Sequence, residues 1–177
     1  PTLLFHDTRY DFGLGPQIRD GDYYGYSCYK DGFERPCILG RVPLAELLVR
    51  DAWRFWDGEG WANDPDDAEP LFRGAPIMTV HWNDYLDAFM AVYASAFDNK
   101  VRLRTAPSLT GPWTGALTLF ESYRGEGNWI YDAVAHPEYA EQGGRIQYIT
   151  FSRPNGDGWF GADFAVWRVE LLRTDVP

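Results

Sequence analysis

The sequence has few cysteines, few histidines, few basic residues and no long hydrophobic run. Two Cys and three His occur among 177 residues, and no apolar run reaches the roughly 18 residues that a membrane span requires. The 16 Lys and Arg residues face 26 Asp and Glu residues, which gives a formal net charge of −10. A nucleic acid or an anionic membrane surface requires a positively charged footprint, so we expect neither as a partner.

Several catalytic and targeting signatures are also missing. The sequence contains no Gly-x-Ser-x-Gly elbow, phosphate-binding glycine loop, His-Glu-x-x-His or Cys-x-x-Cys, which argues against the enzyme classes that these motifs mark. It shows no signal peptide and opens at Pro1 rather than at an initiator Met. We therefore expect a processed, cleaved or trimmed product, whose original targeting signal the sequence does not show.

The two cysteines flank a predicted hairpin tip, Asp31–Glu34. A turn centred there places Cys28 and Cys37 opposite each other on paired strands, close enough to form a disulfide. A disulfide would indicate an oxidising compartment. Two buried thiols are the alternative, and the sequence leaves both open.

Aromatic residues, in contrast, are abundant. Eight Trp, eleven Tyr and eleven Phe make up 17% of the chain. Such side chains fill hydrophobic cores, and their flat rings also pack on the apolar faces of sugars. The composition predicts a substantial core and permits a carbohydrate site.

Three stretches of alternating strands are each accompanied by a Gly-Trp turn, at Gly58–Trp61, Gly111–Trp113 and Gly156–Trp159. A spacing of roughly 45–55 residues with about four strands per unit is typical of β-propeller blades. We therefore predict an all-β partial propeller over residues 1–177, with blade-like units at about 5–65, 66–124 and 125–175. A propeller closes with about four or more blades, so three units form part of a ring.

The segment 82–97 is ambiguous, because its apolar residues also follow helical spacing. Taken alone it predicts an amphipathic helix. The competing interpretation breaks it at Asn83-Asp84 into two strands, 77–82 and 88–96. We favour the strands because β-rich segments flank both sides.

Four stretches are similar to those of one family: residues 38–43, 101–108, 111–113 and 131–138, which read ILGRVP, VRLRTAPS, GPW and YDAVAHPE. Together they resemble the later blades of secreted five-bladed propellers long labelled as a domain of unknown function. Some members are endo-acting arabinanases that cut the D-arabinan of mycobacterial cell walls. The resemblance implies a secreted or extracytoplasmic protein. It also implies about two further blades, so that a second polypeptide, another copy or an absent portion completes the ring.

Glycoside hydrolysis requires two carboxyl groups across the scissile bond. In a propeller we expect them at the axis-proximal ends of the inner strands. The candidate catalytic residues are therefore two acids in the first unit and two in the third: Asp20, Asp22, Glu126 and Asp132.

Five further residues are candidates for substrate binding: His81, Trp82, Trp129, Tyr131 and His136. The three aromatic residues form a sugar-stacking floor or pack between blades. His136 follows Asp132 by four residues, so an extended segment would point both side chains the same way. It could orient a carboxylate, bind sugar hydroxyls, reach a metal or simply stabilise the turn at Pro137.

The acidic loop at residues 64–69 has oxygen ligands of the kind that calcium takes, but it lacks the central glycine of the twelve-residue calcium loop. A solvated loop is the favoured interpretation, so we expect no cofactor while calcium stays open. The leading hypothesis is a glycoside hydrolase-like propeller that acts on furanose-containing, arabinan-like polysaccharide by carboxylate acid/base catalysis. The alternative is a non-catalytic propeller that binds carbohydrate or protein.

Overall fold

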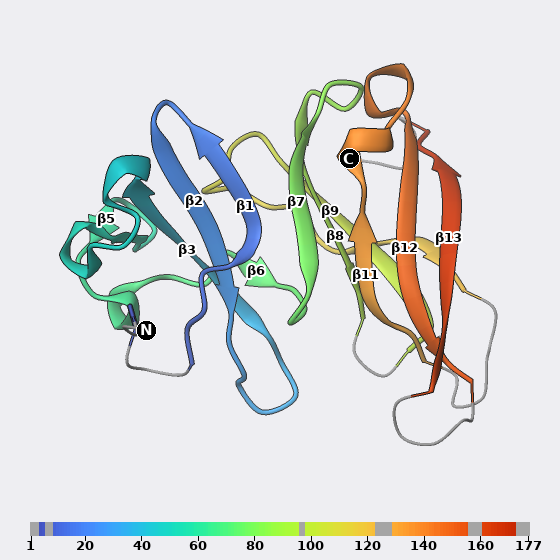
Figure 1. The fold of residues 1–177 in the computed structure, drawn as a ribbon, viewed down its shortest axis with the longest axis horizontal. Helices are drawn as coiled ribbons and strands as arrows, with labels where there is room; N and C mark the ends of the chain where they lie inside the picture. Colours follow the sequence, from blue (N-terminus) through green and yellow to red (C-terminus); the bar gives the residue numbers. More distant parts are fainter. Residues whose placement is uncertain (1–3, 6–8, 96–97, 123–128, 156–160, 173–177) are drawn as a thin grey trace.

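The computed structural model describes residues 4–5, 9–95, 98–122, 129–155 and 161–172. In these segments the chain forms three antiparallel sheets that stand side by side (Figure 1). The connections are turns and short 3-10 segments, and no helix in the described part is long and apolar enough to cross a membrane.

The first sheet has the order β1 (Leu14–Arg19), β2 (Asp22–Cys28), β3 (Pro36–Pro43), β4 (Arg54–Trp56) and β5 (Trp61–Ala62), and β6 (Phe72–Arg73) also pairs with β3. The 3-10 segments Leu44–Glu46, Arg50–Ala52 and Pro65–Asp67 lie in its connections. Asp20 and Gly21 join β1 to β2 with φ values of 52° and 87°. A two-residue turn with two positive φ angles is what an Asp-Gly pair favours between antiparallel strands.

The second sheet has the order β10 (Leu117–Glu121), β9 (Lys100–Ala106), β8 (Ala88–Ala94) and β7 (Met78–Asn83). The third sheet consists of β11 (Tyr131–Ala135), β12 (Ile146–Pro154) and β13 (Ala162–Glu170), with 3-10 segments at Pro137–Tyr139 and Gln142–Gly144. The ambiguous segment 82–97 thus contains two strands, as the favoured interpretation predicts, and no helix up to Ser95.

The second sheet is wedged between the other two. Phe89, Ala91 and Tyr93 of β8 pack in a core with residues of the first sheet. Met90 and Val92, which alternate with them, pack in a second core with residues of the third sheet. Because both faces are covered, β8 is apolar at almost every position, unlike a half-exposed strand.

One strand of each sheet lies at the shared centre: β1, β7 and β11. The Gln17 side-chain amide donates to the Val80 carbonyl at 2.6 Å, which joins β1 to β7. The Ala135 N–H donates to Thr79 Oγ1 at 2.8 Å, which joins β11 to β7. The three sheets therefore spread outward from these three inner strands, an arrangement that we call the fan.

The two ends of the fan differ. A third core on the outer face of the first sheet buries Tyr10, Phe12 and Phe55. On β13, Ala165, Trp167 and Val169 pack inward. Phe164 and Val166, which alternate with them, are 70% and 57% exposed. The third sheet therefore presents an open face.

The two cysteines form a disulfide across the β2–β3 hairpin. Cys28 and Cys37 are register partners, with Cα atoms 4.0 Å apart. The structure therefore has the bridge that the sequence left open, and not two free thiols.

Candidate functional site

A cavity of about 370 Å³ lies where β7 and β11 begin. Its walls come from all three sheets: the β2–β3 hairpin, the segment before β7, the end of β8 and the start of β11. We call it the inner-strand cavity. Its lining residues are Lys30, Gly32, Phe33, Arg35, Gly74, Ala75, Pro76, Ile77, Ala94, Ser95, Trp129, Ile130, Tyr131 and Asp132.

Two aromatic rings form part of this wall. The Trp129 and Tyr131 rings have centroids 5.1 Å apart and planes inclined by 33°. Trp129 is 40% exposed, so core packing leaves part of its surface uncovered. Phe33, at the tip of the β2–β3 hairpin, is 89% exposed. Flat, accessible rings beside polar groups are the features that bind the apolar face of a sugar.

Asp132 provides a carboxyl group in the same cavity. Its φ angle is 56°, and the β11–β12 register shifts between Tyr131 and Val134. A left-handed non-glycine residue at an irregularity in a strand is strained, and such strain is concentrated at functional sites. The side chain is exposed, yet partial desolvation by its surroundings raises the pKa of the Asp132 carboxyl. This favours the protonated form relative to an ordinary aspartate.

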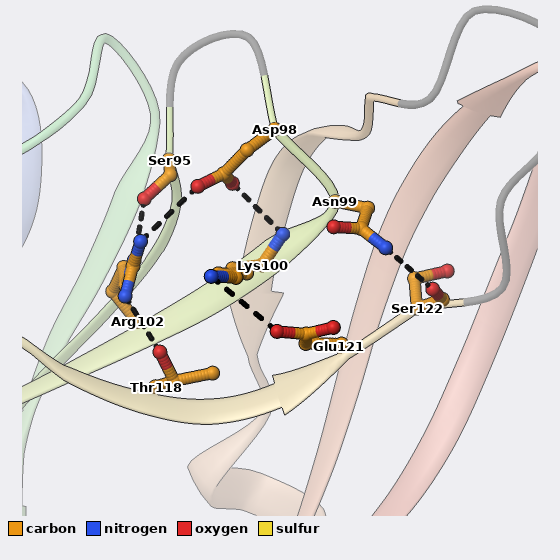
Figure 2. Close-up of polar contacts among 8 residues, drawn as sticks. All are labelled: Ser95, Asp98, Asn99, Lys100, Arg102, Thr118, Glu121 and Ser122. Atoms are coloured by element: carbon orange, nitrogen blue, oxygen red, sulfur yellow. Dashed lines mark hydrogen bonds and ion pairs between the residues drawn. The ribbon is translucent and has the colours of Figure 1, made fainter.

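A polar network fixes the wall formed by the second sheet (Figure 2). The Arg102 guanidinium donates to Ser95 Oγ at 2.6 Å, to Thr118 Oγ1 at 2.6 Å and to Asp98 Oδ2 at 3.1 Å. The Ile130 N–H donates to the Asp98 carbonyl at 2.9 Å. The network therefore joins two residues of the cavity wall, Ser95 and Ile130, to the β8–β9 hairpin that contains Asp98 and Arg102.

Asp20 and Asp22 do not lie at this cavity. They sit at the β1–β2 turn, whereas the β2–β3 hairpin, which lines the cavity, follows the other end of β2. The seven residues of β2 separate these ends by roughly 20 Å. Asp22 lines a different hollow, with Arg41 and Arg54. The structure therefore does not bring either of them together with Asp132.

Trp82 and His81 lie near the far end of β7. The Trp82 ring packs edge-on against Phe89, and its indole N–H donates to Asp84 Oδ1 at 2.9 Å. His81 is 6% exposed, and burial lowers the pKa of its imidazole to about 4. Gln147 lies near enough to oppose this shift, but neither ring nitrogen has a hydrogen-bond partner among the described residues. Both side chains therefore pack against other residues and do not line the inner-strand cavity.

His136 follows β11 and lies away from the inner-strand cavity. Its Nδ1 lies 3.0 Å from Glu138 Oε1, and its Nε2 lies 2.9 Å from Thr150 Oγ1. It lines a separate hollow on the open face of the third sheet, together with Tyr139 and Val166. The segment is not extended at Asp132, so the condition for both side chains to point the same way is not met.

Glu126 lies outside the described residues. In the acidic loop, Asp64 Oδ1 accepts from the Asp66 N–H, and Asp66 Oδ1 accepts from Arg9 and Tyr10. The described segments contain no group of three or more His, Cys, Asp or Glu residues that could hold a metal ion.

The sequence-based search missed the part of the wall that the first sheet supplies. Lys30, Phe33 and Arg35 reach the cavity from the β2–β3 hairpin, about 100 residues before Asp132 in the chain. The one local signal was Phe33, a large aromatic residue at a predicted turn, where no core face requires it.

Comparisons with solved structures identify the fold. A protein from Bacteroides ovatus is 19% identical, with a TM-score of 0.60, and the match covers 80% of this chain and 38% of that chain. An α-L-arabinofuranosidase from Podospora anserina, solved with cellotriose, is 15% identical with a TM-score of 0.54, covering 93% and 48%. A thermostable family-43 glycoside hydrolase is 18% identical with a TM-score of 0.54, covering 95% and 53%. No curated protein matches the chain.

The fold is therefore that of a β-propeller, which the chain shares with the two glycoside hydrolases among these structures, and the predicted partial all-β propeller is confirmed. The chain spans about half or less of the length of these structures. Residues 4–160 match the family described as "Domain of unknown function (DUF4185)". The chain belongs to this family.

Proposed function

We propose that this chain forms the sugar-binding part of a propeller that hydrolyses furanose-containing, arabinan-like polysaccharide, with the inner-strand cavity as its site. The observation that carries the proposal is the meeting of Asp132, Trp129 and Tyr131 in one cavity at the start of an inner strand. An aromatic floor beside a carboxyl group has the composition of a glycosidase subsite.

Asp132 has the role of general acid in this proposal. Protonation of the leaving oxygen requires a carboxylic acid that keeps its proton near neutral pH. The raised pKa of Asp132 is a shift in that direction. Hydrolysis also needs a base or nucleophile, and Asp132 is the one acidic residue among the described lining residues. Glu126, three positions before Trp129 in the sequence, is the candidate for that second role.

The alternative is a propeller that binds carbohydrate without cleaving it. It is favoured by the single carboxyl group in the described wall, because cleavage requires two. Both functions predict that carbohydrate binds in the inner-strand cavity, so a measurement of hydrolysis is what distinguishes them.

The experiment measures the release of reducing ends from arabinan by the purified full-length protein, with its ring complete, and by three variants. We expect Asp132→Asn and Glu126→Gln each to lower the rate by about 100-fold or more, the usual contribution of a positioned acid or base. Asp22→Asn, at the other end of the first sheet, is the matched control and should retain the rate. Binding of arabino-oligosaccharide without any hydrolysis would favour the non-catalytic alternative, and absence of both would refute the proposal.

The proposal includes further blades that complete the ring, and the open face of the third sheet is their expected contact. Phe164 and Val166 are exposed there, at the end of a fan whose opposite face is covered. Another part of the same protein, a second copy or a second polypeptide could supply these blades. The disulfide supports a secreted or extracytoplasmic location, because such bonds persist in oxidising compartments. The mechanism needs no cofactor.

A further inference from the structure

Arg35 lines the inner-strand cavity and has no role in the mechanism above. Its Nη1 atom is buried and has no hydrogen-bond partner among the described residues. Glu34, its neighbour, is engaged by Arg73 at 2.7 Å, and no ion pair joins Arg35 to Asp132 in the described part of the chain. A buried donor that lacks a partner is destabilising, and such exceptions in native proteins call for an explanation.

The backbone holds Arg35 in place for an external partner. Its carbonyl accepts from the Gly74 N–H at 2.9 Å, and the next residue, Pro36, pairs with Arg73 of β6. Two positions further along, Cys37 is bridged to Cys28. The backbone that carries the guanidinium is therefore fixed by a cross-linked hairpin, so ligand binding has to order only the side chain.

The cavity is locally cationic in an acidic protein. The described lining has two cationic residues, Lys30 and Arg35, and one acidic residue, Asp132, although the whole chain carries a formal charge of −10. Lys30 is exposed and forms no ion pair within the described segments. With Asp132 protonated and Glu126 ionised, as in the proposed mechanism, a neutral sugar would leave one of these two positive charges unmatched, whereas a carboxylate or phosphate would neutralise it. Guanidinium groups bind such anions by charge-assisted, often bidentate hydrogen bonds.

From these observations we propose that the inner-strand cavity selects a sugar that carries an acidic group, a carboxylate or a phosphate, which Arg35 binds and Lys30 attracts. Trp129 and Tyr131 hold the ring of the same sugar. The inference rests on the proposed function, because it names the substrate class of that same site.

The test compares three ligands that differ at one carbon: a methyl arabinofuranoside, its 5-phosphate and the corresponding uronic acid. Calorimetric titration of the purified protein at low salt gives each affinity. We expect one or both acidic ligands to bind at least about tenfold more tightly than the neutral one, with an advantage that shrinks as salt is added. The acidic ligand that binds more tightly identifies phosphate or carboxylate as the natural group.

Variants assign the preference to Arg35. Arg35→Gln should remove the advantage of the acidic ligands and change neutral binding less than about twofold, whereas Arg35→Lys should keep part of it because the charge remains. Arg54→Gln, another half-buried arginine that lies outside the cavity, is the control, and thermal unfolding verifies that each variant folds.

Equal affinity for all three ligands, or a preference for the acidic ligands that survives in Arg35→Gln, would overturn the inference. If the protein still hydrolysed arabinan, the proposed function would stand. Loss of hydrolysis and of all binding would overturn both.

Discussion

Asp132 offers a test in which stability and function should change in opposite directions. Its φ of 56° lies in the left-handed region, which costs a non-glycine residue roughly 1–2 kcal/mol. Glycine removes this cost, but its additional freedom in the unfolded chain returns roughly 0.5–1 kcal/mol. We therefore expect Asp132→Gly to raise the free energy of unfolding by about 0.5–1 kcal/mol. In a chain of this size that corresponds to a Tm increase of about 1–4 °C.

Asp87 is the matched control. It has a φ of 53°, is exposed, and lies in the turn between β7 and β8, away from the inner-strand cavity. Asp87→Gly should give a similar increase in stability and leave ligand binding unchanged. Asp132→Gly should weaken the binding of arabino-oligosaccharide and abolish hydrolysis. Thermal and urea unfolding give the stabilities, and calorimetric titration gives the affinities.

Two results would refute this reasoning. If Asp132→Gly lowered stability while Asp87→Gly raised it, the Asp132 carboxyl group would be contributing a structural contact rather than being held under strain for a ligand. If Asp132→Gly retained both binding and hydrolysis, the residue would have no role in the site.

Three further predictions follow from the packing. The pKa of His81 in the folded protein is about 4, below the ordinary 6.5. The stabilising contribution of the neutral imidazole is therefore complete above pH 6.5, and about 3 kcal/mol of it is lost as the pH falls to 4. Urea titrations at several pH values should show that the free energy of unfolding depends less on pH in His81→Leu. Reducing the Cys28–Cys37 bridge, which closes a separation of nine residues, should cost about 3 kcal/mol, and equal urea midpoints with and without reductant would contradict this. Phe164→Asp should destabilise the complete ring by about 1–2 kcal/mol, because it buries a charge where blades meet; an unchanged Tm of the full-length protein would show that nothing covers this face.

The strands were predictable because local patterns determine most of them. The alternation of apolar and polar residues over 101–105 predicts a strand, and β9 spans these residues. The helical spacing in 82–97 arose because β8 is buried on both faces, so apolar residues fill nearly all its positions and match several periods at once. Only the flanking strands favoured the correct interpretation.

The Gly-Trp turns indicated the right architecture but do not occupy equivalent positions. Gly58–Trp61 joins β4 to β5, and Gly111–Trp113 lies between β9 and β10. Gly156–Trp159 lies outside the described residues. Trp61 and Trp113 both pack against the core of the first two sheets, so these motifs indicate core packing at turns rather than a strict repeat.

The candidate site was predictable only where its residues are neighbours in sequence. Trp129, Tyr131 and Asp132 were found because the start of an inner strand is short and rich in these types. Asp20 was separated from them by strand direction, because it follows an inner strand whereas Asp132 begins one. Arg35 belongs to the same wall through contacts between sheets, which no local pattern records.

The most direct test of the central claim is a crystal structure of the protein with a bound arabino-oligosaccharide. We predict that a sugar ring lies in the inner-strand cavity, against Trp129 or Tyr131 and within hydrogen-bonding distance of Asp132. An ordered ligand at the hollow beside His136, or an empty inner-strand cavity at saturating ligand, would contradict the account.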